Sequence, residues 1–175
     1  RNKNNISVFH TNVESLNHNF ESLQDLLTCC DIEFDVIGVS ETWNSKSRSA
    51  NFRPGLLEGY HKYEGQPGHS IKGGCGLYIR NDITFTDRKK LNISYCDANN
   101  EFQMKRVEII NKKHVNTIVG VVYRHPRKTS DETFLSYLEK TLTSIGKENK
   151  NVILMGDFNY CLLKYDCDKW VKNFV

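Results

Sequence analysis

Short apolar segments, each followed by a polar residue, constrain the fold of this 175-residue chain more than any other feature. Residues 35–40 form a nearly continuous apolar run, which suits a strand that is buried on both faces. Residues 151–155 form a second apolar strand near the other end of the chain. Five more strands are expected, the last two joined as a hairpin: Ile6–His10, Tyr60–Tyr63, Leu77–Arg80, Phe102–Ile110 and Val115–Tyr123.

Apolar residues at helical spacing separate some of these strands. Two sets recur every three or four positions and predict two helices: Leu16, Phe20, Leu23 and Leu27, and Phe134, Leu138, Leu142 and Ile145. Asn17 is the expected cap of the first, and Ser130 or Asp131 caps the second, which ends at Gly146. A third helix is expected to begin at Asp168. This alternation predicts an α/β layered sandwich rather than a helical bundle or an all-β barrel.

The charge is mildly basic, with 24 Lys and Arg against 21 Asp and Glu and a formal net charge of +3. That balance is compatible with a nucleic-acid partner. No stretch of about 20 apolar residues occurs, so we expect no membrane-spanning helix. Basic clusters at 88–90, 105–106 and 112–113 are interpreted as solvated loop charge, whereas the cluster at 124–128 directly follows an apolar strand and favours a phosphate contact.

The six cysteines show no paired Cys-x-x-Cys spacing of the kind that binds zinc. We interpret them as reduced thiols of an intracellular protein, with a disulfide framework as the alternative.

Polar residues lie where four predicted strands end: Asn12, Glu41, Tyr123, and the pair Asp157 and Asn159. Ligands of layered α/β proteins gather at the carboxyl ends of strands, so these residues predict one common site. Asp157 and Asn159 lie two apart and would project together, with Phe158 packing on the opposite side. A carboxylate that takes a proton beside an amide that donates to phosphoryl oxygens suits phosphoester chemistry.

Each of these residues also has a structural interpretation. The segment at 155–159 could be only a turn, because Gly, Asp and Asn are common turn residues. Glu41 suits a hard cation such as Mg²⁺, or it is an exposed glutamate at a strand end. Asn12 could orient Glu41, bind phosphate or form a turn. Tyr123 could donate to phosphate or could be a half-buried strand residue.

Five motifs occur in an order and at a spacing that resemble the endonuclease/exonuclease/phosphatase superfamily. They are Asn12, Ser40-Glu41-Thr42-Trp43, Gly73–Ile79, Val121–Pro126 and Gly156-Asp157-Phe158-Asn159. Ser15-Leu16 after Asn12, and the Tyr-Arg-x-Pro pattern at Tyr123–Pro126, are most similar to the endonuclease domains of LINE-type (non-LTR) retrotransposons.

The resemblance implies a four-layered α/β sandwich of the DNase-I-like type and cleavage of phosphodiesters with Mg²⁺, or with Mn²⁺. It implies that Glu41 is the principal metal ligand with Asn12 beside it, and that Asp157 orients or deprotonates water. By the same resemblance, Asn159 and Tyr123 hold the phosphoryl group. DNA-backbone contacts are expected from Arg124, His125 and Arg127.

Two departures from the family pattern qualify these expectations. A late Ser-Asp-His segment is missing, since no histidine follows Asp157. We therefore expect residues 1–175 to be one domain that lacks its C-terminal strands, poorly soluble and nearly inactive. Its parent would nick DNA in the nucleus and carry a following reverse transcriptase. Glu14 also stands where relatives often carry a basic residue, which would weaken a DNA contact.

Three other functions fit parts of the pattern. A dimetal phosphoesterase could use Gly-Asp-x-Asn, but it would need an early Asp-x-His and a later Asn-His, and the sequence has neither. A catalytically dead retroelement remnant, or a binding module on the same fold, is a second alternative. A sugar- or lipid-phosphate phosphatase of the same superfamily is a third.

Overall fold

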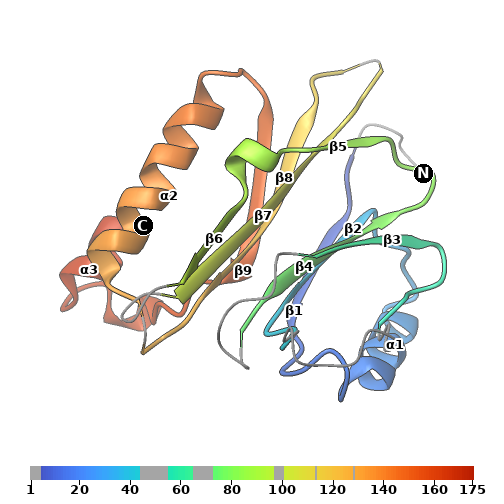
Figure 1. Ribbon diagram of the computed structural model, residues 1–175, viewed down its shortest axis with the longest axis horizontal. Coiled ribbons are helices and arrows are strands. Elements are labelled where there is room, and N and C mark those ends of the chain that lie inside the picture. The colour runs from blue at the N-terminus through green and yellow to red at the C-terminus, as the bar shows by residue number, and fades with distance from the viewer. Residues whose placement is uncertain (1–4, 44–54, 65–72, 97–100, 113, 128) are drawn as a thin grey trace.

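Two β-sheets pack face to face, and a helix covers the outer side of each (Figure 1). The computed structural model describes residues 5–43, 55–64, 73–96, 101–112, 114–127 and 129–175. The core between the sheets is aliphatic, with Val36, Leu77 and Ile79 from one sheet against Val119 and Val121 from the other. The four layers confirm the predicted α/β sandwich.

The first sheet has the strand order β1-β2-β4-β3, and only β1 and β2 run parallel. Its strands are β1 (Val8–Asn12), β2 (Val36–Ser40), β3 (Tyr60–Glu64) and β4 (Cys75–Arg80). Helix α1 (Phe20–Cys29) links the parallel pair, as parallel strands require a crossover. Leu23 of α1 packs on Ile37 and Val39 from the outer face of the sheet.

The second sheet has the order β5-β7-β8-β9, with β6 also paired to β7. Its strands are β5 (Phe85–Asp87), β6 (Ile93–Cys96), β7 (Glu101–Ile109), β8 (Thr117–Arg124) and β9 (Asn151–Asp157). Strands β7 and β8 form the predicted hairpin, and β8 and β9 are parallel through helix α2 (Asp131–Gly146). Phe134 and Leu138 of α2 pack on Phe102, Met104 and Val122.

The remaining elements are the short helices η1 (Lys89–Leu91), η2 (Leu162–Lys164) and α3 (Lys169–Phe174). The carboxylate of Asp168 caps α3 by accepting from the backbone N–H groups of Trp170 and Val171, which confirms the predicted third helix. None of the helices in the described part of the chain has the length and apolar character that a bilayer crossing requires.

Several predicted boundaries differ from the structure. Helix α1 begins at Phe20 with Asn19 at its cap position, so the expected Asn17 cap was wrong, and Leu16 is a buried loop residue. Ser130 caps α2 and the helix ends at Gly146, both as predicted, but Gly146 does not adopt the left-handed conformation and Leu142 is 42% exposed. The short strands β5 and β6 were not predicted. The loops expected at 44–56 and 65–74 lie mostly outside the described residues.

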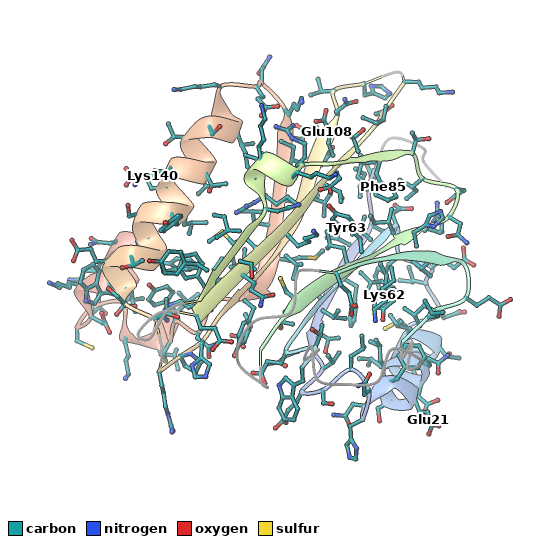
Figure 2. The ribbon with its side chains drawn as sticks, viewed as in Figure 1. Glu21, Lys62, Tyr63, Phe85, Glu108 and Lys140 are labelled. Atoms are coloured by element: carbon teal, nitrogen blue, oxygen red, sulfur yellow. The ribbon has the colours of Figure 1, made fainter. Side chains whose placement is uncertain are left out.

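Three members of the basic clusters, Arg88, Lys105 and Arg106, are not the solvated charge that the sequence suggested, whereas Lys89 and Lys90 are exposed as expected. Arg106 is 0% exposed and donates to the carbonyl oxygen of Leu91, and burial lowers its pKa to about 10. The ammonium of Lys105 lies 4.0 Å from the centre of the Tyr63 ring, and burial lowers its pKa as well. Figure 2 labels Tyr63 beside Phe85 between the two sheets.

The half-buried Arg88 belongs to an ion-pair network near the start of β8 and β9, at the end of the sheet far from Tyr123 and Asp157. Its guanidinium pairs with Glu108 at 2.6 Å and with Glu148, and Lys150 contacts both carboxylates at 2.8 Å. The side chain of Glu108, labelled in Figure 2, is only 10% exposed. The network ties the end of α2 to the sheet.

Candidate functional site

One asparagine joins the two sheets at their common rim. The amide nitrogen Nδ2 of Asn12 donates to Oε1 of Glu41 at 3.0 Å and to Oδ2 of Asp157 at 3.2 Å. Asn12 is the last residue of β1, Glu41 directly follows β2, and Asp157 is the last residue of β9. Strand ends from both sheets thus bring together three residues that the sequence predicted for one site.

Glu41 is held at both of its carboxylate oxygens. While Oε1 accepts from Asn12, Oε2 accepts from the indole nitrogen of Trp43 at 3.2 Å. Its backbone is in the left-handed region, with φ of 55°. A carboxylate fixed in this way is oriented in advance for a ligand, because little conformational freedom is left to lose on binding.

Strained backbone is concentrated around this rim. Of the seven non-glycine residues with positive φ in the described part of the chain, five lie in its loops: Glu14, Ser15, Glu41, Trp43 and Asn159. Such conformations cost about 1–3 kcal/mol each and persist only where the surrounding structure enforces them. Their clustering distinguishes the rim from the rest of the described chain.

Tyr123 lies in β8 directly beside Asp157 of β9. Its side chain is buried, and burial is the main cause that raises its pKa above the ordinary tyrosine value. The negative charges of Glu41, Glu101 and Asp157 raise the pKa further. The phenol therefore stays protonated and remains a hydrogen-bond donor at every pH near neutrality.

The segment after β9 turns instead of continuing as a strand. Oδ1 of Asp157 accepts from the backbone N–H of Asn159 at 3.1 Å, and Nδ2 of Asn159 donates to the carbonyl oxygen of Arg124 at 2.7 Å. Phe158 packs near Phe134 on the far side, as predicted from the sequence. Asp157 and Asn159 therefore lie close together, but Asp157 contacts the backbone N–H of Asn159 and not its side chain. The side-chain amide of Asn159 is bound to the carbonyl oxygen of Arg124 instead.

Arg124 lies inside the protein rather than on the rim. It is 4% exposed, and its guanidinium donates to the carbonyl oxygens of Asn159 at 3.2 Å and Thr129 at 3.3 Å, and to the carboxylate of Asp131. This geometry does not fit the expected phosphate contact and indicates a structural clamp instead. Of the same cluster, His125 is half-buried and Arg127 is exposed.

Two residues near the rim received no role in the sequence analysis. His10 lies within 3.2 Å of the hydroxyl of Ser40, and burial lowers its pKa while the charge of Asp157 opposes that shift. Trp43 binds Glu41 directly. The signal for His10 was its position two residues before Asn12, on the same face of β1.

The donor set limits which metal the rim could hold. No group of three or more His, Cys, Asp or Glu side chains suited to a metal ion occurs among the residues that the structure describes. Mg²⁺ keeps several waters and usually takes one or two protein carboxylates, whereas sites that hold two metal ions need more ligands. Glu41 and Asp157 together fit a single, largely hydrated Mg²⁺.

Comparison with known proteins agrees with this fold. The sequence pattern of the Endonuclease/Exonuclease/phosphatase family matches residues 5–174. A search of curated proteins gave no match.

Three of the similar solved structures show the extent of the match. The endonuclease domain of TRAS1, a telomere-specific non-LTR retrotransposon, superposes with a TM-score of 0.65 at 14% identity over 96% of this chain and 67% of that one. The Xenopus laevis APE2 catalytic domain gives 0.60 at 14% identity, over 97% and 66%. D. rerio TDP2 complexed with single-strand DNA product gives 0.62 at 15% identity, over 96% and 64%. The chain thus spans about two thirds of these structures, and such low identities establish the fold alone.

Proposed function

Because the chain belongs to the endonuclease/exonuclease/phosphatase family, we propose that its rim hydrolyses phosphodiesters with Mg²⁺ and that its substrate is DNA. The observation that carries the proposal is the bridge from Asn12 to Glu41 and Asp157. Two carboxylates held at hydrogen-bonding distance from one neutral amide attract a divalent cation, since neither accepts a hydrogen bond from a positively charged side chain in the part of the chain that the structure describes.

Each side chain has a distinct part in the proposed reaction. Glu41 would hold the ion, and Asn12 keeps Glu41 and Asp157 in register. When bound, Mg²⁺ would neutralise charge on the phosphoryl oxygens. Asp157, fixed at both oxygens by Asn12 and the N–H of Asn159, accepts a proton from the attacking water.

Tyr123 supplies the donor in this proposal. Its phenol remains protonated and lies among the charges of Glu41 and Asp157, so it can donate to a phosphoryl oxygen as negative charge develops there. Asn159 holds the turn after Asp157 through the Arg124 carbonyl, and its amide would need to rotate before it could contact phosphate.

DNA is favoured over other phosphate esters by the relatives. The structures described as a retrotransposon endonuclease and as TDP2 with single-strand DNA product share this fold over nearly all of the chain. Exposed Arg127 and half-buried His125 follow β8 and could contact the DNA backbone. We further propose that the parent protein is a LINE-type retrotransposon product, with a reverse transcriptase after this domain and action in the nucleus.

A phosphatase is the second candidate, because the same fold includes a protein described as ANGEL2, a 2',3'-cyclic phosphatase. Assays with a supercoiled plasmid and with a small phosphomonoester as substrates distinguish a nuclease from a phosphatase. We expect a low rate of Mg²⁺-dependent nicking from this chain, which Glu41→Ala and Asp157→Ala lower by about 100-fold or more and Glu139→Ala on α2 leaves unchanged. Hydrolysis of the monoester without nicking would favour the phosphatase.

Calorimetric titration with Mg²⁺ tests whether this chain is a catalytically dead remnant or a binding module. If the site is intact, the unsubstituted chain binds Mg²⁺ and Glu41→Ala does not. If the chain is a module without a metal site, neither protein gives a heat of Mg²⁺ binding. Nicking that survives Glu41→Ala would contradict the proposed site.

A further inference from the structure

A cavity of about 590 Å³ opens directly beside the rim. It is formed by the loops that follow β1 and β2, and its lining residues are Glu14, Ser15, Asn17, His18, Asn19 and Trp43. Its volume lies within the range of small-molecule sites in proteins, about 300–1,000 Å³. The mechanism proposed above uses none of these residues.

Hydrogen bonds between the two loops fix the shape of this cavity. The N–H groups of Ser15 and Leu16 donate to the carbonyl oxygens of Glu41 and Thr42 at 2.8 and 3.2 Å, which extends the β1–β2 contact beyond the strands. Nδ2 of Asn19 donates to the carbonyl oxygen of Glu14 at 2.9 Å. The cavity therefore exists before any ligand binds, and little ordering cost remains.

Trp43 connects the cavity to the rim. Its indole nitrogen donates to one oxygen of Glu41, and the other oxygen of Glu41 accepts from Asn12. A group in the cavity is thus separated from the proposed metal and phosphate position by a single carboxylate. That separation suits the neighbouring nucleotide of the same strand, and the indole offers an aromatic face on which a base can stack.

The charge of the lining favours a base over a phosphate. Among its described lining residues there is no lysine or arginine, and Glu14 adds a negative charge that repels phosphate. The side-chain oxygen of Asn17 is buried and accepts no hydrogen bond within the part of the chain that the structure covers. Rotation of the Asn17 amide toward the cavity would let the N–H of a base satisfy that oxygen, and buried acceptors are costly when left unpaired.

We propose that this cavity is a nucleobase subsite that holds the base next to the scissile phosphate, with Trp43 as its stacking platform. The inference rests on the proposed function, since it places a nucleotide of the substrate beside the rim. The negative charge of Glu14, which would weaken a contact to the DNA backbone, then determines what binds here. It excludes phosphate from the cavity, so that the cavity is available to the base.

Fluorescence tests the subsite, because the chain has only two tryptophans, Trp43 and Trp170. Trp170 lies on α3 and lines a separate groove against α2, so Trp170→Phe leaves Trp43 as the only indole reporter. The protein is titrated, with Ca²⁺ in place of Mg²⁺ to limit cleavage, with two short single-stranded oligonucleotides. They are identical except that one carries an abasic sugar in place of the central base.

The oligonucleotide with the base should quench Trp43 and bind about 10-fold more tightly, a difference typical of stacking by one base. Trp43→Leu should remove this preference, and Trp43→Phe should keep most of it because a ring remains. Asn17→Ala should reduce it. The Trp170→Phe background itself should bind both oligonucleotides as the unsubstituted chain does.

Equal affinity and equal quenching for the two oligonucleotides would overturn the subsite, and intact Glu41-dependent nicking would then leave the proposed function standing. Preference for the base that persists in Trp43→Leu would also overturn it, since the base would then bind elsewhere. Absence of binding by either oligonucleotide would overturn the subsite together with DNA as the substrate.

Discussion

Asn12 and Asp157 lie 145 positions apart in the sequence, and a hydrogen bond of 3.2 Å joins their side chains. The bond links the last residue of β1 in one sheet to the last residue of β9 in the other. Because the same amide also contacts Glu41, the spacing of the two carboxylates depends on Asn12. The sandwich thereby sets the geometry of the rim.

Removal of this amide should weaken the site without unfolding the protein. We expect Asn12→Ala to lower Mg²⁺ affinity or nicking about 10–100-fold, the usual effect of losing a residue that orients metal ligands. Asn12 is exposed, so the free energy of unfolding should change little. Calorimetry with Mg²⁺ and urea denaturation measure the two effects, with Asn173→Ala on α3 as the control. Equal Mg²⁺ affinity in Asn12→Ala and the control would show that the bridge does not organise the site.

Tyr123→Phe should lower the nicking rate about 10²–10³-fold with little change in KM, because it removes one donor to the developing charge. Burial raises the pKa of this phenol, so the donor persists to higher pH than an ordinary tyrosine would allow. We therefore expect no fall in rate between pH 7 and about 10 from ionisation of this group. A rate profile that drops near the ordinary tyrosine pKa, and does so only when Tyr123 is present, would contradict this role.

Gly156 has no room for a side chain. Its φ is 150°, and a Cβ at this position would lie 2.0 Å from the carbonyl oxygen of Val122 in β8. Gly156→Ala should therefore destabilise the fold by about 3 kcal/mol or more and displace Asp157.

Gly146 at the end of α2 is the matched control, because nothing lies within 4 Å of its added Cβ. Gly146→Ala should stabilise the protein by about 0.5–1 kcal/mol. Urea midpoints measure both changes. Similar midpoints for the two variants would show that strand β9 can shift to accept a side chain.

The sequence pattern predicted the strands and helices best where apolar spacing is regular. Strands β2, β7, β8 and β9 and helix α2 lie within a few residues of their predicted positions. Strands β5 and β6 were missed, since they are short and are defined by pairing with β7 rather than by a local apolar pattern.

The residues of the candidate site could be predicted from the sequence, but the contacts between them could not. Polar residues after strands indicated a common edge, yet only the packing of two sheets brings Asp157 to Asn12. The burial of Arg124 was not predictable locally, because its partners Asp131, Thr129 and Asn159 come from segments on both sides of α2. A basic run in sequence does not reveal which of its members points inward.

The network around Arg88 should make stability sensitive to acid. Hydrogen bonds from Arg88 and Lys150 lower the pKa of Glu148 to about 2. Burial alone would raise the pKa of Glu108. Hydrogen bonds from Lys150, Asn116 and Arg88 outweigh burial, so the pKa of Glu108 is lowered as well. A carboxylate with a depressed folded-state pKa stabilises the fold above its unfolded pKa, near 4.3, and loses that contribution as the pH falls toward the folded value.

We therefore expect the urea midpoint to fall between about pH 5 and pH 2. Glu148→Gln should lower stability at pH 7 and flatten this acid dependence. Glu148 is partly exposed and solvent screens its ion pairs, so the loss of one pair should lower the free energy of unfolding by only about 1 kcal/mol. Glu139→Gln, at an exposed position on α2, provides the control and should leave the acid profile unchanged. An acid profile that Glu148→Gln does not alter would assign the acid sensitivity to other carboxylates.

Arg124 and Arg127 should respond differently, although three positions separate them. Arg124→Ala removes contacts to Asp131 and to three backbone carbonyls in a buried position, so it should cost about 3–5 kcal/mol of stability. Arg127→Ala, at an exposed residue, should leave stability unchanged but weaken DNA binding uniformly across sequences. It should also reduce the slope of log affinity against log salt concentration by about one. Binding at several salt concentrations, combined with urea denaturation, separates the two roles. An unfolding midpoint unaffected by Arg124→Ala, with a reduced salt slope, would instead place Arg124 on the DNA.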